Sequence, residues 1–253
     1  MNPVIVRNIK IGEGIPKICA PIAEAPREEI LSSAKNIREA GADLVEWRAD
    51  WYEDVFDIKK VEETAGELRR VLGNMPILFT FRTAEEGGER GIEQEAYLAL
   101  NQKAAESGYI DLIDVQVFIE NDVVKSIIET AHNCGVKVVA SNHDFLGTPA
   151  EEEIISRLRG MQKLGADILK IAVMPRGAKD VLTLLAATEK MYSEYADRPL
   201  ITMSMAGKGV ISRVCGEVFG SAITFGSAGK ASAPGQMDVE DLKTVLEILH
   251  RSF

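Results

Sequence analysis

Short apolar runs alternate with longer amphipathic stretches along the whole chain. The runs are rich in Val, Ile and Leu, which is typical of strands buried on both faces of a parallel sheet. They predict strands at 17–21, 43–48, 77–82, 110–117, 136–143, 167–173, 200–205 and 222–225. Between them, apolar residues recur every three or four positions, as on one face of a helix. Such patterns include 28–40, 151–165, 179–195 and 238–250.

The order of these elements predicts an α/β fold. Strands that alternate with crossover helices form a parallel sheet with right-handed connections. Eight such units in 253 residues match a (β/α)8 TIM barrel, which takes about 250 residues. An open doubly wound sheet is the alternative that the pattern allows. No low-complexity linker divides the chain, so a single domain is expected over residues 1–253. Residues 1–14 form an N-terminal extension, which we expect to be a hairpin covering one end of the barrel.

The composition describes an acidic soluble protein. The chain has 29 Lys+Arg against 39 Asp+Glu, a formal charge of −10, which argues against a nucleic-acid partner. No run of 18 apolar residues exists, so no contact with a membrane is expected. Three cysteines without a CxxC pair suit a reducing compartment, and the N-terminus lacks a signal-peptide apolar block. These features predict a cytoplasmic protein. If its ligand is an anion, cations must be gathered locally to bind it.

A lysine inside an apolar strand is the sharpest chemical signal. Lys170 lies between Ile168, Leu169, Ile171 and Ala172. Two interpretations fit this position. The side chain can point outward between helices and extend its ammonium to the surface. Alternatively, it can point into the barrel as a desolvated amine, a nucleophile toward carbonyl carbon, whose free form is favoured by burial and by nearby cations.

Two further side chains are candidates for proton transfer. His143 ends the strand predicted at 136–143 and is either a core residue with local hydrogen bonds or a general acid/base. Glu86 is either an ordinary loop acid or the group that orients this histidine. The other histidines, His132 and His250, fall in helical patterns and are expected at the surface. The histidine spacing matches no metal-binding motif, so no metal is expected.

Three arginines supply the local cations. Arg48 and Arg82 lie at strand ends, and Arg213 follows the seventh strand. Each alone is commonly a salt-bridge partner, but at the carboxyl ends of barrel strands they converge on one mouth. There they can bind a carboxylate through two hydrogen bonds and polarise hydroxyls. The glycine-rich segment 226–236 follows the last strand and is either a plain loop or a lid.

Seven motifs in order along the chain together resemble the type I 3-dehydroquinate dehydratases. They are EWRAD (46–50), FTFR (79–82), EGG (86–88), SNHDF (141–145), KIAVMP (170–175), ITMSMAGKGVISR (201–213) and SAPGQ (232–236). The resemblance implies a (β/α)8 barrel, usually a homodimer. It also implies removal of water from 3-dehydroquinate to give 3-dehydroshikimate in the shikimate pathway, without metal or cofactor. The small molecule would then be the main partner.

The resemblance also implies the role of each site residue. Lys170 matches the Schiff-base lysine, His143 the proton-transfer histidine, and Glu86 the acid that pairs with it. Arg213, with Ser232 and Gln236 on the lid, matches the carboxylate-binding group, and Glu46, Arg48 and Arg82 match the residues that hold the ring hydroxyls. The chain departs from the family in one place: many relatives carry Glu where Gln116 follows Asp114 by two positions. If position 116 faces the interior, a charge near the site is missing.

Two other functions remain open at this stage. A class I aldolase also uses a strand lysine as a Schiff base, but it cleaves carbon–carbon bonds. A non-catalytic barrel could bind a hydroxy acid without turning it over. The joint presence of Lys170, His143 and Glu86 favours an enzyme over such a sensor.

Overall fold

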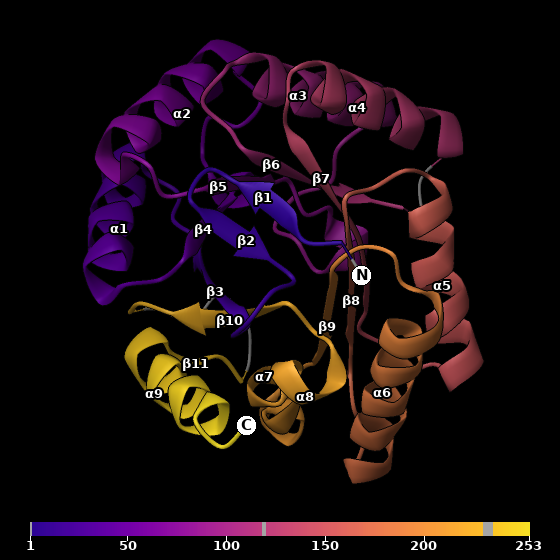
Figure 1. Cartoon of the computed structure of the whole chain (residues 1–253). Helices are drawn as coiled ribbons and strands as arrows, with labels where there is room; N and C mark the ends of the chain where they lie inside the picture. Colours follow the sequence, from indigo (N-terminus) through magenta and orange to yellow (C-terminus); the bar gives the residue numbers. More distant parts are fainter. Residues whose placement is uncertain (1, 118–119, 230–234) are drawn as a thin grey trace.

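Eight parallel strands form a barrel inside a ring of helices (Figure 1). The computed structural model describes residues 2–117, 120–229 and 235–253. The barrel strands are β3 (Lys17–Ile22), β4 (Leu44–Arg48), β5 (Ile77–Thr80), β6 (Leu112–Gln116), β7 (Lys137–Asp144), β8 (Ile168–Val173), β9 (Leu200–Ser204) and β10 (Ile223–Ser227). A short strand, β11 (Met237–Asp238), pairs with β10 outside the barrel order.

The barrel closes between its seventh and eighth strands. β10 pairs with β3 on one side, and on the other it meets β9 through a bridge between Leu200 and Ser221. The Ala222 amide donates to the Leu200 carbonyl over 2.7 Å at this seam. An open doubly wound sheet would leave two unpaired edges, so the barrel prediction is confirmed and the alternative is wrong.

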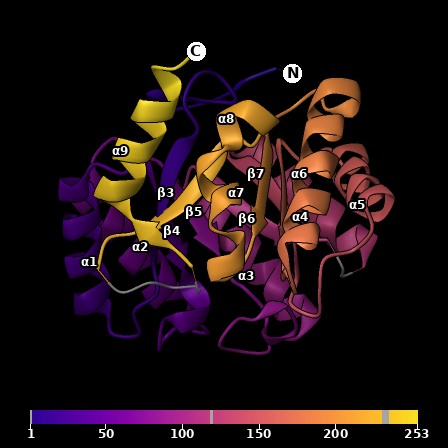
Figure 2. The same ribbon diagram turned by 90° about the horizontal axis from the view of Figure 1, so that it is seen from below.

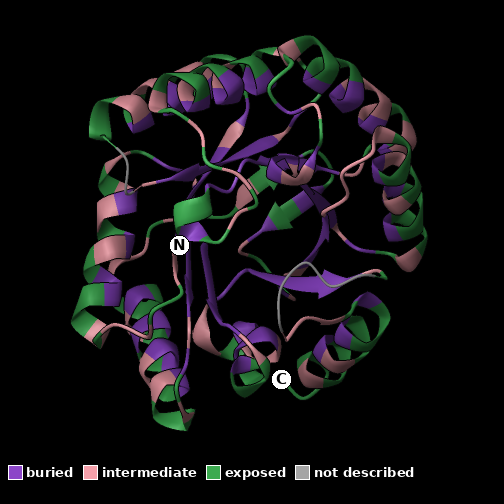
Figure 3. Cartoon of the chain, turned by 180° about the vertical axis from the view of Figure 1, so that it is seen from behind, coloured by how far each residue is buried: buried purple, intermediate pink, exposed green. Residues whose placement is uncertain are grey.

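The helices cover the outside of the barrel. They are α1 (Arg27–Ala40), α2 (Ile58–Leu72), α3 (Gln94–Glu106), α4 (Asn121–Asn133), α5 (Glu151–Lys163), α6 (Ala178–Lys190), α7 (Ile211–Val214), α8 (Gly216–Phe219) and α9 (Val239–His250). The stretch predicted as one helix at 179–195 is divided, because α6 passes into a π-turn, Met191–Tyr195. The outer faces of the helices are exposed, while the strands are buried (Figure 3). Within the described ranges, none of the helices is long and apolar enough to cross a membrane.

The N-terminal extension closes one end of the barrel, as predicted. β1 (Val4–Val6) and β2 (Ile9–Ile11) pair antiparallel and lie across that end (Figures 1 and 2). Val6, Ile9 and Ile11 are buried in one apolar cluster with the first interior layer of the barrel. Here the first layer means the first interior residue of each strand, and all eight lie in this cluster: Cys19, Leu44, Leu78, Leu112, Val139, Ile168, Ile201 and Ile223.

The next interior layer is unusually polar. Side chains alternate between the two faces of a strand, so the residue two positions further along also faces the interior. Glu46 and Lys170, for example, follow Leu44 and Ile168 in this way. Buried polar groups must find partners within the layer, because no bulk water reaches them. The layer consists of Pro21, Glu46, Thr80, Asp114, Ser141, Lys170, Met203 and Phe225.

Candidate active site

The amine of Lys170 points into the barrel, not out between the helices. Its side chain is buried, and Nζ lies 3.3 Å from Oε1 of Glu46 and 3.1 Å from Oδ2 of Asp114. The ring of Phe225 lies beneath it, with Nζ 4.7 Å from the ring centroid. The surface interpretation is therefore wrong. Two carboxylates lie in direct contact with the nitrogen; the sequence prediction placed Glu46 at the site but placed neither Glu46 nor Asp114 against this amine.

A second ion pair shares Asp114 with the first. Arg82 donates from Nη2 to Oδ1 of Asp114 at 2.8 Å and from Nη1 to Oγ of Ser141 at 2.9 Å. The Ser141 hydroxyl donates to the same Asp114 oxygen at 2.5 Å. Burial raises the pKa of Asp114, but the charges of Arg82 and Lys170 outweigh it and bring that pKa below its usual value. Asp114 is therefore an anion that holds two cations in fixed positions.

His143 is paired with Glu86. Nδ1 of His143 lies 3.0 Å from Oε2 of Glu86, and the backbone amide of His143 donates to the same oxygen at 2.9 Å. Burial raises the pKa of Glu86 despite the nearby charge of Arg82. Burial, followed by the charges of Arg82 and Lys170, holds the pKa of His143 well below its usual value. With Glu86 ionised, Nδ1 carries the ring proton, and Nε2 is left free to accept one.

The two glycines that follow Glu86 are required by the shape of its loop. Gly87 has a φ of 79°, and a side chain there would lie 2.4 Å from the ring of Phe145. A side chain on Gly88 would lie 1.8 Å from the Arg82 carbonyl oxygen. The turn is thus packed against the strand from which it emerges, which brings Glu86 back toward His143.

A cavity of about 160 Å³ brings these groups together. Its walls include Lys170, His143, Glu86, Glu46 and all three arginines of the sequence prediction, with Met203, Met205 and Phe225 as apolar lining and Gln236 at one side. Ser232 belongs to the lid prediction but lies outside the described residues.

Arg213 is a buried cation that lines this cavity. It follows β9, and burial lowers the pKa of its guanidinium. Its Nε and Nη1 atoms have no hydrogen-bond partner among the described residues. Buried guanidinium groups are normally paired with an anion. The carboxylate of a bound ligand can supply that anion.

Two buried acids of the site were missed by the sequence analysis as functional residues. Asp114 interrupts the apolar run of β6 just as Lys170 interrupts that of β8, so the same signal was available for it. Asp50 gave no such signal, because it lies in a 3-10 turn, Ala49–Trp51, where acidic residues are common. His132 and His250 are exposed and bond to Asp167 and Glu217, as their predicted surface positions imply. Across the described ranges, no cluster of three potential metal ligands occurs.

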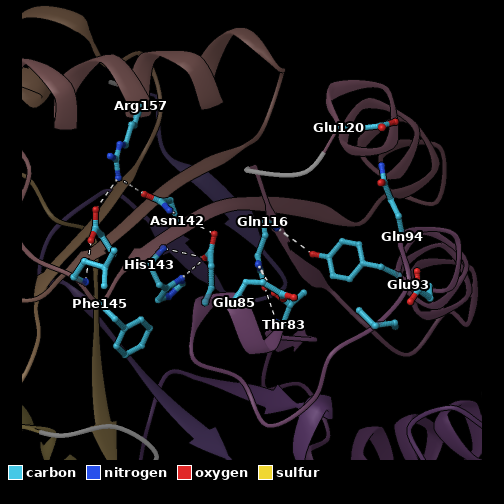
Figure 4. A pocket seen from close by; sticks show the side chains of 15 residues that line it. Thr83, Glu85, Glu93, Gln94, Gln116, Glu120, Asn142, His143, Phe145 and Arg157 are labelled. Carbon is cyan, nitrogen blue, oxygen red and sulfur yellow. Dashed lines mark hydrogen bonds and ion pairs between the residues drawn. The ribbon is translucent and has the colours of Figure 1, made fainter.

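Gln116 faces the interior side of β6 but bonds away from the lysine. Its Oε1 accepts from the Thr83 amide at 2.7 Å, and its Nε2 donates to the Thr83 hydroxyl at 3.1 Å. Gln116 and Thr83 line a larger cavity of about 1060 Å³, whose wall also includes Glu86 and His143 (Figure 4). A charge at position 116 would therefore lie on the side of the His143–Glu86 pair that faces away from the lysine.

Fold and cavity together define a (β/α)8-barrel enzyme with its polar centre at the carboxyl ends of the strands. The chain belongs to the type I 3-dehydroquinase family, whose sequence model matches residues 18–252. The 3-dehydroquinate dehydratase of Listeria welshimeri is 57% identical over 253 residues, with 100% of each chain covered.

Solved structures show the same relationship. The type I 3-dehydroquinate dehydratase of Clostridium difficile, crystallised with covalent modified comenic acid, is 52% identical with a TM-score of 0.98, and the match covers 100% of both chains. The 3-dehydroquinate dehydratase of Geobacillus kaustophilus is 40% identical with a TM-score of 0.96, covering 99% of both chains.

Proposed function

We propose that this enzyme removes water from 3-dehydroquinate to give 3-dehydroshikimate through an imine on Lys170. The observation that carries the proposal is the buried amine of Lys170 in a cavity whose wall also contains the His143–Glu86 pair. The reaction class is hydro-lyase, and the pathway is the one that leads from 3-dehydroquinate to the aromatic amino acids. The lack of a membrane-spanning helix in the described residues and three free cysteines support a cytoplasmic location.

Lys170 supplies the electron sink. Its nitrogen adds to the ketone carbon, and loss of one water from the carbinolamine gives a protonated imine. This cation accepts the electron pair that remains when the neighbouring carbon loses its proton. Glu46 and Asp114 stabilise the cation, since both lie within 3.3 Å of the nitrogen. The paired anions compensate for the burial of the positive charge.

His143 carries the proton. Its depressed pKa leaves the imidazole neutral and able to act as a base at neutral pH. It removes the proton next to the imine carbon and then, as imidazolium, donates a proton to the departing hydroxyl, which leaves as water. Glu86 stabilises the imidazolium at Nδ1, from 3.0 Å away. Water then hydrolyses the product imine and restores Lys170.

Arg213 supplies the anchor for the substrate. The buried guanidinium has no partner at Nε or Nη1 among the described residues, so the carboxylate of a hydroxy acid can pair with it and hold the reacting carbon at His143. We assign Gln236 and Ser232 to the same carboxylate, and Glu46, Arg48 and Arg82 to the ring hydroxyls. The Clostridium difficile relative, 52% identical to this chain, was crystallised with covalent modified comenic acid, which supports a reactive group in this family.

Absorbance after addition of 3-dehydroquinate tests the function, because the product is a conjugated enone acid and the substrate is not. We expect a steady rise in ultraviolet absorbance with purified protein alone. Binding of the compound without that rise would mean a sensor. Cleavage of sugar phosphates without that rise would mean an aldolase.

Replacement of Gln116 by glutamate is expected to shift the pH dependence of kcat/KM. The new carboxylate can still accept from the Thr83 amide and hydroxyl, so the loop should keep its position. Its negative charge favours imidazolium and raises the depressed pKa of His143. The base form then requires a higher pH, and the acid limb should move upward by roughly 0.5 to 1 on the pH scale.

Gln102→Glu is the matched control for this charge. Gln102 bonds to Ser126 and Thr130 between α3 and α4, away from the cavity. Its substitution should leave the pH–rate profile unchanged. An unchanged profile in Gln116→Glu as well would show that position 116 is not coupled to the acid–base pair.

We propose that the enzyme is a homodimer and that an apolar face on α6, α7 and α8 joins the two copies. These helices lie side by side (Figures 1 and 2). Tyr192 packs against Gly220 and so joins the end of α6 to the end of α8. The exposed apolar side chains of this face are Leu182, Tyr192, Val210, Ile211 and Val218.

Sedimentation equilibrium tests this face. The wild-type chain should have twice its 27.7 kDa mass, and Val218→Arg should weaken association on the order of 100-fold. Ile5→Glu on the hairpin, equally exposed and apolar, is the control and should remain dimeric. A monomeric wild type, or a Val218→Arg variant that stays dimeric, would contradict the assignment.

A further inference from the structure

The carboxylate of Asp50 is fully buried and uses all of its hydrogen-bonding capacity. Oδ1 accepts from Nε of Arg48 at 2.8 Å and from the Arg82 amide at 3.2 Å. Oδ2 accepts from Nη2 of Arg48 at 2.7 Å and from the Glu89 amide at 3.2 Å. A carboxylate has about four acceptor positions, so none is left over.

These four bonds join three parts of the cavity wall. The paired bonds to Arg48 fix the plane of its guanidinium, since a fork of two parallel bonds defines an orientation. The bond to the Arg82 amide holds the residue that follows β5. The bond to the Glu89 amide closes the far end of the loop that carries Glu86. Asp50 itself is not part of the cavity wall.

The other end of the same loop is held independently. Thr83 is bonded to Gln116, and the Gly88 amide donates to the Thr83 carbonyl at 2.9 Å. The loop therefore has two buried attachments, Gln116 at its start and Asp50 near its end. Between them, Glu86 has little freedom to move away from His143.

We propose that Asp50 is a positioning residue for the dehydration. It sets the direction of the Arg48 guanidinium for substrate binding, and it holds the loop so that Glu86 meets His143. The inference rests on the proposed function, because it assigns Arg48 to binding and Glu86 to proton transfer. The contrasting possibility is that Asp50 only stabilises the fold.

Asp50→Asn separates these possibilities by its effect on KM and kcat. The amide keeps one acceptor oxygen, presents an NH₂ group to N–H donors, and carries no charge to hold Arg48. We expect KM to rise and kcat to fall, each about tenfold, since small displacements of positioned groups cost up to about 100-fold in rate. In an Arg48→Met background, the change in KM should disappear while the change in kcat remains.

Asp111→Asn is the matched control. Asp111 is also bonded to two arginines, Arg7 and Arg69, and to the Ile77 amide, but it lies at the end of the barrel that the hairpin closes. Its substitution removes a comparable network. It should lower the melting temperature and leave kcat and KM unchanged.

The outcomes are distinct. Wild-type kcat and KM in Asp50→Asn, or equal losses in Asp111→Asn, would overturn the positioning role. A change in KM that persists in the Arg48→Met background would also overturn the route through Arg48. Absence of turnover by the unsubstituted enzyme would instead refute the proposed function. If Asp50→Asn does not fold, Asp50→Glu, which keeps the charge but displaces it, takes its place with the same two losses expected.

Discussion

Replacement of Lys170 by methionine is expected to lower kcat on the order of 10⁵-fold, the loss typical of removing a covalent nucleophile. Methionine fills a similar space but cannot form an imine, so the carbanion that follows proton removal has no electron sink. Borohydride added with substrate reduces an imine to a stable amine. Intact mass and peptide mapping should therefore find an adduct on Lys170 in the wild type and none in the variant.

Two controls make the Lys170 result specific. Lys137 begins β7 at the opposite end of the barrel and pairs with Asp167, so Lys137→Met should keep both turnover and adduct. Lys170→Met leaves Glu46 and Asp114 without one of their cations, and removal of one partner of a buried ion pair costs about 3 kcal/mol or more of stability. Circular dichroism must show that the variant is folded. A folded variant with wild-type turnover, or an adduct on another residue, would rule out the imine mechanism on Lys170.

Replacement of His143 by alanine is expected to separate imine formation from elimination. The cavity retains the amine of Lys170 and the cation of Arg213, so substrate should still bind and form the imine. Proton removal loses its base, which commonly contributes about 10² to 10⁴-fold to the rate. We expect kcat to fall within this range while the borohydride adduct remains abundant.

His132→Ala is the matched control for His143. His132 bonds to Asp167 on the surface and should be dispensable for turnover. Calorimetry of substrate binding decides the meaning of a low rate in His143→Ala. Failure to bind and failure to form the adduct would make His143 a binding or structural residue and would refute its assignment as the base.

The barrel could be predicted because its strands and helices have different periods. An apolar run of four to eight residues indicates a buried strand by its length, and longer helical patterns separate these runs along the chain. The hairpin over the closed end was also visible in the alternation of Val6, Ile9 and Ile11 with polar residues. Element ends were less well predicted. β5 ends at Thr80, two residues before its predicted end. The backbone amide of Arg82 bonds to the Asp50 carboxylate and not to a neighbouring strand, so the chain leaves the sheet there.

The site could be predicted where strand alternation alone decides the direction of a side chain. Lys170, Asp114 and Glu46 each follow an apolar residue by two positions and so share its face, and the structure shows that this face is the interior one. The pairing of loop residues could not be predicted in this way. Whether Glu86 reaches His143 depends on two glycines, on the ring of Phe145 and on the hydrogen bonds that Asp50 and Gln116 make to its loop.

By itself, then, the sequence determined the elements, their order and which residues of a strand share a face, since these depend on local periodicity. The tertiary structure decided which of them touch. Glu46 and Lys170 are 124 positions apart and meet at 3.3 Å only because the barrel closes with a particular stagger between strands. The same closure gives Lys170 two carboxylate partners, leaves Arg213 without one among the described residues, and places Asp50 behind the cavity wall. Those distances depend on the packing of all eight strands at once, and a sequence pattern within one strand or helix does not determine that packing.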